Sequence, residues 1–338
     1  MDLLNKVVFH KVFQSGIVID VDAAYITVRF KVGEKKFMFP DAFDGFLSTE
    51  DKDLMMDIRD KMAAKKAEKL KTQKEQAPPS AVLKPERNRS KTKSYARANI
   101  AFKCNYCDGG KSSHQIGYCG VCSDAIINNN IAVEHRTWCT ADTSACLQYF
   151  NSEISRQELD GMCKDGGFVC YESQMLRDWK ALAGIVQHGE NKGKPMKLNR
   201  VQANSLCALT TRDPCSMEDE RYIFAVFLVD ETYDGDKFDE GYVSTKSKYK
   251  IKLSPYEAHQ VLFWNYHANE NQSKVAAWNS GLHRYFDDMQ AAQILQDIAR
   301  VKRDTEDEVL AQEFFDYFCE INGLNASELP PLQGALKI

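Results

Sequence analysis

Four cysteines in the stretch CNYCDGGKSSHQIGYCGVC, residues 104–122, form two Cys-x-x-Cys pairs with eleven residues between them. Two thiolates at this spacing can reach one ion, and two such pairs complete a tetrahedron around Zn²⁺. The predicted ligands are Cys104, Cys107, Cys119 and Cys122. Because four thiolates leave no open position for water, the predicted zinc is structural rather than catalytic. Iron bound by the same four thiolates is the alternative.

Four further cysteines form a second, less regular group. Cys139 and Cys146 have six residues between them, as do Cys163 and Cys170. Free cysteine is among the most buried residue types, so these four can simply be small core residues. The alternative is a second metal ion or an iron–sulfur cluster held by the same thiols.

Aromatic and polar side chains alternate in the second half of the chain in a way that suits a nucleobase pocket. In FWNYHANEN, residues 263–271, Trp, Tyr and His interleave with three Asn, and such mixing is a costly way to fill a core. A base stacked on an aromatic ring contributes about 1–3 kcal/mol, and placed polar groups recognise its edge. The candidate residues are Tyr171, Trp179, Trp264, Tyr266 and Trp278 as stacking faces, and Glu172, Ser173, Asn265, His267, Asn269 and Arg284 as polar groups. For Trp179 and Trp264 the alternative is packing in the domain core.

No motif of a known catalytic class accompanies these residues. The sequence has no Gly-x-Ser-x-Gly, no phosphate-cradling glycine loop and no His-Glu-x-x-His. Asp230 and Glu231, followed by STKSKYK, loosely fit a metal-dependent nuclease, although acids at a strand end are usually only solvated. We therefore expect a non-enzymatic protein, and we keep a nuclease or base-modifying enzyme as the alternative.

A basic segment ends directly before the first Cys-x-x-Cys pair. Residues 61–103 hold thirteen Lys or Arg against three Glu, a charge of +10, which leaves −14 for the rest of a chain whose net charge is −4. A basic arm on an acidic body commonly binds a polyanion, so nucleic acid is the predicted partner. The predicted phosphate contacts are Lys84, Arg87, Arg89, Lys91, Lys93 and Arg97. The alternative is a solvated linker kept soluble by its lysines.

Targeting signals are not apparent. No run approaches the roughly 18 apolar residues that a membrane helix needs, and the start MDLLNKVVFHK lacks the regions of a signal peptide. We therefore expect a cytoplasmic protein with no membrane partner, in which clustered thiols usually bind metal.

The first 48 residues are expected to form a small β domain. Apolar and polar residues alternate over 26–30, as in a half-buried strand. The segments VVFHKVFQSGIVIDV, ITVRF and GEKKFMF resemble the Tudor-like, SH3-like barrel at the C-terminus of UvrD/PcrA-type helicases. Gly16 keeps one glycine of that family's pattern, whereas Gln14 replaces another. The resemblance implies a docking module for protein or nucleic acid.

The last 190 or so residues are expected to form an α+β domain. Strands are predicted over 166–173, 204–211, 221–231 and 249–253, and helices over 286–303 and 306–322. Capping boxes at Ser155, Ser254 and Thr305 mark helix starts. A strand at 166–173, a helix carrying Trp179 and a mostly antiparallel sheet are similar to the PUA-like superfamily, which includes the EVE, YTH, ASCH and SRA domains. That resemblance implies a pocket for an unpaired, modified base.

These observations predict an α+β multidomain protein. Its expected parts are an SH3-like barrel (1–48), a basic helix and flexible linker (49–99), a four-cysteine zinc ribbon (100–150) and a PUA-like domain (151–338). The predicted function is nucleic-acid binding with a structural zinc, in the setting of bacterial defence, restriction or RNA metabolism. A nuclease of a defence system and a zinc-ribbon adaptor that recruits a protein partner through the barrel are the alternatives.

Overall fold

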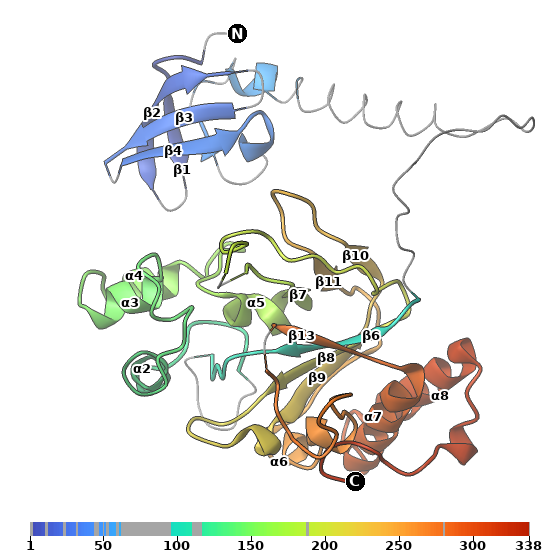
Figure 1. Ribbon diagram of the computed structural model, residues 1–338. Helices are drawn as coiled ribbons and strands as arrows, with labels where there is room; N and C mark the ends of the chain where they lie inside the picture. The colour runs from blue at the N-terminus through green and yellow to red at the C-terminus, as the bar shows by residue number, and fades with distance from the viewer. Residues whose placement is uncertain are drawn as a thin grey trace, which may run out of the picture. The chain divides into compact units, whose positions relative to one another are not determined.

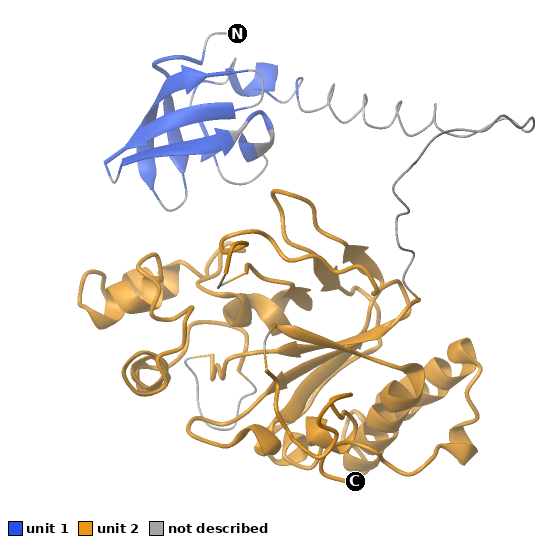
Figure 2. Cartoon of the chain, viewed as in Figure 1, with its two compact units in different colours: residues 1–91 blue, residues 92–338 orange. Residues whose placement is uncertain are grey.

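The computed structural model describes residues 3–10, 13–22, 25–31, 33–43, 47–49, 51, 54–58, 61, 96–109, 117–186, 189–279 and 281–337. The chain divides into two compact units, residues 1–91 and 92–338 (Figure 2). Helices and strands are mixed, so the predicted α+β class is confirmed. The expected zinc ribbon, residues 100–150, and the expected domain 151–338 lie together in the second unit.

Unit 1 is a five-stranded antiparallel sheet with its own core. Its strands are β1(Val7–His10), β2(Gln14–Val21), β3(Tyr25–Phe30), β4(Gly33–Met38) and β5(Leu47–Ser48). The first four follow one another as a meander, and β5 returns to pair with β1. The predicted alternation over 26–30 is confirmed, because Ile26, Val28 and Phe30 are buried and Arg29 is exposed. Leu54 and Ile58, which are helical and fall in the segment 49–99 expected to begin with a basic helix, complete this core.

Two positions near the start of β2 favour glycine, one because of its close neighbours and the other because of its backbone angle. A Cβ on Gly16 would lie 2.5 Å from Cδ1 of Phe30 and 2.7 Å from Cγ1 of Val28, so a side chain there forces the core to shift. Gln14 has a φ of +59°, in the left-handed region that glycine adopts without strain. The position where glutamine replaces the glycine of the family pattern therefore keeps a glycine-like backbone.

Unit 2 is built on a five-stranded sheet in the order β12-β9-β8-β6-β13 (Figure 1). Its strands are β6(Asn99–Lys103), β8(Leu206–Thr211), β9(Tyr222–Leu228), β12(Lys250–Lys252) and β13(His283–Phe286). β6 and β8 run parallel, and the other neighbours are antiparallel. Every residue of β8 and β9 is buried, as their apolar runs predicted. β6 leads into the first cysteine pair, so that pair is anchored to the main sheet of the large unit.

A second, three-stranded sheet follows the helix α5(Tyr171–Asp178). It has the order β10-β11-β7 and consists of β7(Lys180–Leu182), β10(Glu231–Tyr233) and β11(Tyr242–Ser244). The prediction of a strand over 166–173 is wrong, because Cys170 is the N-cap of α5. Ser173 Oγ accepts the N–H groups of Val169 and Cys170 at 3.0 and 3.2 Å, so capping bonds at the helix start override the apolar run. The element order that resembles the PUA-like superfamily thus begins here with a helix.

The remaining helical segments flank these sheets. They are α2(Asp124–Asn128), the π-helical η2(Asn129–Val133), α3(Ala145–Phe150), α4(Arg156–Gly161), η3(Glu218–Glu220), α6(Pro255–Ala258), η4(Phe263–Asn265), α7(Asp288–Val301), α8(Glu308–Asn322) and η5(Ala326–Glu328), with η1(Asp41–Phe43) in unit 1. The capping boxes at Ser155 and Ser254 are confirmed. The one at Thr305 is wrong, because α8 begins after Asp307 and the Glu308 carboxylate accepts the N–H of Asp304 instead.

Candidate functional site

The first cysteine follows the end of β6 and is held in the core. The N–H of Cys104 donates to the carbonyl oxygen of Thr210 at 2.9 Å, which extends the pairing of β6 with β8. The Cys104 thiol lies 3.8 Å from the carbonyl oxygen of Phe102 and 3.6 Å from Sδ of Met175 on α5. Its thiol therefore packs against α5.

The two Cys-x-x-Cys pairs approach each other through glycine backbone. A Cβ on Gly117 would lie 1.7 Å from the carbonyl oxygen of Cys107, so only glycine permits this approach. A hydrogen bond with Cys107, together with burial, raises the pKa of the Cys122 thiol. Cys119 is exposed. Of the four predicted zinc ligands, the structure thus pairs Cys107 with Cys122. Cys104 interacts electrostatically with Cys107 but forms its closest described contacts with Phe102 and Met175.

A cavity of about 20 Å³ adjoins this pair of thiols. One water molecule needs about 10–15 Å³, so the cavity has room for one water or one ion. We call it the thiol cavity, and its sulfur and carboxyl groups belong to Cys107, Cys122, Cys139, Cys146, Cys170 and Glu172. The structure therefore joins thiols of the two predicted cysteine groups around one small space.

The later cysteines reach the cavity from the starts of two helices. Cys146 lies in the first turn of α3, after the N-cap Ser144, and Cys170 is the N-cap of α5. The fourth member of the second predicted group, Cys163, does not line the cavity. Chain segments that are far apart in sequence thus meet at the cavity.

A buried carboxyl group accompanies the thiols. Glu172 Oε1 accepts the N–H of Asn105 at 2.9 Å, and the carboxyl group also forms a hydrogen bond with Cys170. Burial raises the pKa of Glu172, although these hydrogen bonds oppose the shift. Burial also raises the pKa of Cys139 to about 12 and that of Cys146 to about 11. At neutral pH, burial therefore favours the protonated thiols.

The donor chemistry of the thiol cavity fits a thiophilic ion, although its geometry is not a finished coordination shell. Among the residues that the structure describes, no three His, Cys, Asp or Glu side chains converge as a ready metal site. Zn²⁺ with bonds of about 2.3 Å sets its tetrahedral sulfurs about 3.8 Å apart. The observation that fits such an ion is the set of sulfur donors around a space with room for one ion.

Cationic side chains gather where the parallel strands β6 and β8 end. Lys103 is the last residue of β6, Arg212 follows β8, and Arg221 precedes the antiparallel β9. Arg284 pairs with the β6 residue Ala101 in register, and Arg136 follows η2. Electrostatic interactions connect Lys103 with Arg136, Arg212 and Arg221, and connect Arg284 with Glu218. We call Lys103, Arg136, Arg212, Arg221 and Arg284 the cationic edge.

Carboxylates of the protein balance only part of this charge. Glu218 forms ion pairs with Arg221 and, at 3.8 Å, with Arg212, while Glu134 pairs with Arg136. Burial and the neighbouring charges of three arginines lower the pKa of Lys103, and no ion pair to it occurs within the described ranges. Nε of Arg136 and of Arg212 are buried donors without a hydrogen-bond acceptor. An anion would supply the missing acceptor.

One buried ring supports two of these guanidinium groups. The Trp278 ring centroid lies 5.1 Å from Cζ of Arg221 and 5.4 Å from Cζ of Arg284. The Trp278 side chain is 1% exposed, and its Nε1 donates to the carbonyl oxygen of Gly281 at 3.1 Å. Of the predicted base-binding residues, Arg284 therefore belongs to the cationic edge, and Trp278 packs beneath it without an open face.

Three rings of the FWNYHANEN stretch, those of Phe263, Trp264 and Tyr266, are packed in the core. Trp264 and Tyr266 are 0% and 2% exposed. Backbone N–H groups of residues 334, 335 and 336 donate to the carbonyl oxygens of Asn265, His267 and Trp264 at 3.0, 3.0 and 3.1 Å. The C-terminal segment thus lies along this stretch, and the structure supports core packing of these rings over base stacking.

The other predicted base-binding residues have structural partners. The Tyr171 hydroxyl donates to Glu240 at 2.7 Å, and Asn269 Nδ2 donates to the carbonyl oxygen of Ala277 at 2.8 Å. Trp179 ends α5 with a φ of +47°, and its ring packs edge-on against a β9 phenylalanine. Ser173 caps α5 as described above. Of this group only Glu172 lines the thiol cavity.

The predicted phosphate contacts lie mostly outside the described residues. Lys84, Arg87, Arg89, Lys91 and Lys93 all fall there. Arg97 is described, and its guanidinium donates to Asp288 at 2.5 Å, to Asn322 at 2.5 Å and to the carbonyl oxygen of Asn204 at 3.0 Å. These three partners give Arg97 a structural role at the start of α7 and the end of α8.

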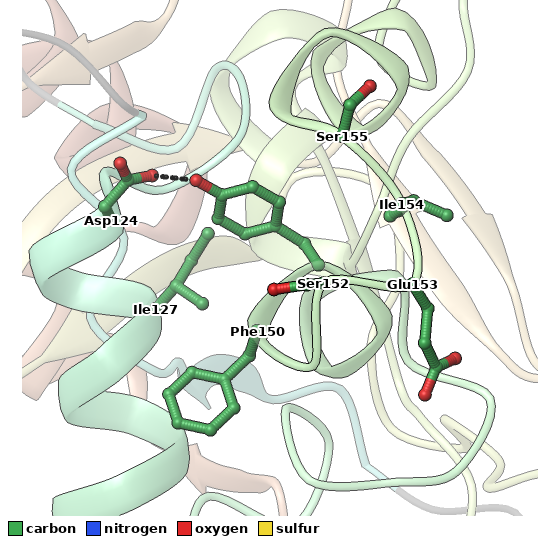
Figure 3. Close-up of a pocket in the computed structure, with 8 residues that line it drawn as sticks. Asp124, Ile127, Phe150, Ser152, Glu153, Ile154 and Ser155 are labelled. Atoms are coloured by element: carbon green, nitrogen blue, oxygen red, sulfur yellow. Dashed lines mark hydrogen bonds between the residues drawn. The ribbon is translucent and has the colours of Figure 1, made fainter.

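A larger, open pocket of about 560 Å³ lies between α2 and α3 (Figure 3). The Tyr149 hydroxyl donates to Asp124 at 3.1 Å across it, and Glu153 adds a second carboxylate. No lysine or arginine lines it. The charged residues that line it are two acids, one of them paired with the adjacent Arg156, so the cationic edge is the better candidate for nucleic acid.

The two acids of the nuclease alternative are engaged in local hydrogen bonds. Asp230 Oδ2 accepts the N–H groups of Lys246 and Ser247 at 2.7 and 2.9 Å. Glu231 accepts the hydroxyls of Tyr242 and Ser244 at 2.8 and 3.0 Å, which lowers its pKa. Both carboxylates thus stabilise the β10–β11 hairpin and the turn after it.

Sequence reasoning missed the cationic edge as a set. Its members come from five segments that only the sheet brings together. Part of a signal was available, because Lys103 and Arg212 each follow an apolar strand directly and Glu218 stands three residues before Arg221. The thiol cavity was also missed, since local spacing suggested two separate cysteine groups.

Comparisons with known proteins identify no relative. A scan against protein-family models, a search of curated proteins and a search of solved structures each found no match. The described helices include none that is both long and apolar enough to cross a membrane. Function must therefore be inferred from the residues and their geometry.

Proposed function

We propose that the protein binds a nucleic acid through its phosphates at the cationic edge. The observation that carries the proposal is the excess of positive charge there: among the described residues, Lys103, Arg136, Arg212 and Arg221 share the carboxylates of Glu134 and Glu218. Partly buried like charges repel one another, so a bound phosphate gains more free energy there than on an open surface. Guanidinium groups can also hold phosphate oxygens through two parallel hydrogen bonds.

The basic segment 61–103 supports the same function. It carries a charge of +10 and leads directly into β6, whose last residue is Lys103. The positive charge of the segment favours association with a polyanion. The five-stranded unit 1, with its SH3-like strand order, is proposed to dock the complex onto a protein or nucleic acid, and reading of a modified base stays a prediction.

A structural thiophilic ion is part of the proposal. Arg136 of the cationic edge interacts electrostatically with Cys139 and Glu172 of the thiol cavity. An ion bound by the cavity thiols would cross-link the chain on both sides of Arg136. Chelation is then expected to weaken nucleic-acid binding, because it frees the segment that positions Arg136.

Binding of labelled single- and double-stranded DNA and RNA, measured by fluorescence anisotropy at several salt concentrations, tests this function. We expect affinity to fall steeply between about 50 and about 200 mM salt, with a slope of about 0.9 log units per neutralised phosphate on B-DNA. An affinity that does not change with salt, or no binding to any of the four, would overturn the proposal. The nuclease alternative predicts cleavage of the same probes with Mg²⁺, lost on changing Asp230 or Glu231.

Substitutions locate the interface. Lys103→Met and Arg212→Gln should each weaken binding to all sequences alike and reduce the salt slope by about one phosphate. Lys192→Met, which changes an exposed lysine away from the edge residues, is the charge-matched control for Lys103→Met. Equal losses in the control and the edge variants would mean that binding depends on overall charge and not on this site.

A further inference from the structure

We infer that one thiophilic metal ion is held by four thiolates drawn from both cysteine groups, Cys107, Cys122, Cys146 and Cys170. Cys104 and Cys119, which local spacing assigns to the same zinc, are then not ligands. This inference concerns the ligand set and does not depend on nucleic-acid binding.

The four thiols form one connected group. Cys122 forms a hydrogen bond with Cys107 and interacts electrostatically with Cys146 and Cys170. Cys170 in turn interacts with Cys107 and Cys146. All four line the same cavity of about 20 Å³. All four thiols therefore border one space that has room for one ion.

The excluded cysteines are placed differently. The Cys104 thiol packs against Met175 Sδ and the Phe102 carbonyl, and Cys119 is exposed. Neither lines the cavity. A ribbon-type site would have to bring both of these thiols to the cavity, whereas the four thiols of the mixed set already line it.

Cys139 also lines the cavity, and we place it outside the ligand set. Four thiolates complete a tetrahedral shell, so one of the five thiols that line the cavity is left out. Zinc loss in Cys139→Ser with retention in Cys146→Ser would overturn this choice. Glu172 interacts with both Cys139 and Cys170 and accepts the Asn105 N–H. We assign Glu172 as a positioning residue, because its carboxyl group forms a hydrogen bond with Cys170 and can orient that thiol.

The surroundings can balance the charge of such a site. Four thiolates and a divalent cation carry a net charge of −2. The Arg156 guanidinium interacts electrostatically with Cys146 and donates to the carbonyl oxygen of Cys122 at 2.9 Å. Cys170 lies at the N-terminus of the eight-residue α5, where the helix dipole favours negative charge. Arg156 also pairs with Asp124 and Asp160, so the start of α5 and hydrogen bonds to the thiolates must supply most of the stabilisation.

The chemistry favours Zn²⁺. Soft thiolates in a tetrahedron select zinc or iron over Mg²⁺ and Ca²⁺. A space with room for one ion fits a mononuclear site better than a cluster of several iron and sulfide atoms. The site is then structural, because four thiolates leave no position for substrate.

Metal content of single Cys→Ser variants of the full chain tests the ligand set. Wild type should hold one zinc per chain, and Cys146→Ser and Cys170→Ser should lose most of it, with binding at least about ten-fold weaker. Cys119→Ser and Cys139→Ser should retain the zinc. Cys207→Ser, which alters a fully buried cysteine of β8 outside the cavity, controls for the cost of burying a hydroxyl. Loss in Cys119→Ser with retention in Cys146→Ser would overturn the mixed set in favour of the ribbon.

Wild-type protein provides a second test where a variant fails to fold. Alkylation followed by peptide mapping compares the metal-loaded protein with protein treated with a strong chelator. The four proposed ligands should be protected from alkylation only in the absence of chelator, whereas Cys119 and the exposed Cys215 should be alkylated equally in both. Cys207 should stay unmodified in both conditions unless the chain unfolds. Equal labelling with and without chelator, or a brown protein that contains iron and sulfide, would each overturn the proposed mononuclear zinc.

Discussion

The guanidinium of Arg221, 1% exposed, binds both carboxylate oxygens of Glu218, with Nε–Oε1 and Nη2–Oε2 distances of 2.5 and 2.9 Å. This pair stands at the end of the main sheet, where Arg212 shares the same carboxylate. Glu218 is therefore both the partner of a buried charge and the main acid within an otherwise cationic group.

Changing Glu218→Gln separates these two roles. Removing the charge that pairs with buried Arg221 should lower the free energy of unfolding by about 3 kcal/mol. It should also strengthen nucleic-acid binding, because the cationic edge loses its main internal anion. Denaturant titration and anisotropy measure the two effects, and Glu190→Gln, at an exposed acid, is the control. Weaker binding by folded Glu218→Gln protein would contradict the assigned interface.

Two half-buried histidines should make the large unit sensitive to acid. Burial, with a contribution from the Arg284 charge, lowers the pKa of His267 and of His283 to about 4. The unfolded chain binds protons near the ordinary value of 6.5, so stability falls as the pH drops from 6.5 towards 4, by up to about 3 kcal/mol per histidine.

The measurement is denaturant unfolding across that pH range. The His267→Gln/His283→Gln double variant should show a shallower pH dependence than wild type, whereas His135→Asn, at an exposed histidine, should not. Identical pH dependence in wild type and the double variant would mean that other groups account for the acid sensitivity.

A buried ion pair links α6 to the end of α7. Lys302 Nζ lies 2.9 Å from Glu257 and 3.1 Å from Asp307, and its side chain is 6% exposed. Lys302→Met should destabilise by about 3–5 kcal/mol because it leaves buried carboxylate charge unpaired, and adding Glu257→Gln should recover part of that loss. The matched surface pair Lys248–Glu313 should contribute less than about 1 kcal/mol. Similar losses for Lys302→Met and Lys248→Met in thermal unfolding would refute the distinction.

Substitutions at Gly16 and Gln14 of unit 1 should change stability in opposite directions. Gly16→Ala places a Cβ 2.5 Å from Phe30 and should lower stability by about 1–3 kcal/mol. Gln14→Gly relieves a left-handed backbone at φ +59° and should be neutral or stabilising by up to about 1 kcal/mol. Thermal unfolding of both variants decides the point, and a stabilising Gly16→Ala would show that the strand pairing differs from the one described.

Sequence alone determined those features that depend on neighbours in the chain. Alternation over 26–30 places Ile26, Val28 and Phe30 in a core because strand side chains alternate between faces. The boxes at Ser155 and Ser254 start helices because their hydrogen bonds span only three residues. The same local logic failed at residues 166–173, where apolar content suggested a strand and the capping bonds around Cys170 start a helix.

Tertiary structure decided which chemical groups meet. Cysteine spacing grouped Cys104 with Cys119, whereas the fold gathers Cys107 and Cys122 with Cys146 and Cys170 around one cavity. The cationic edge likewise exists only because β6 pairs in parallel with β8, a strand about a hundred residues later. Side chains this far apart in the chain meet through strand pairing and burial, which are properties of the whole core, and no local pattern of residues records them.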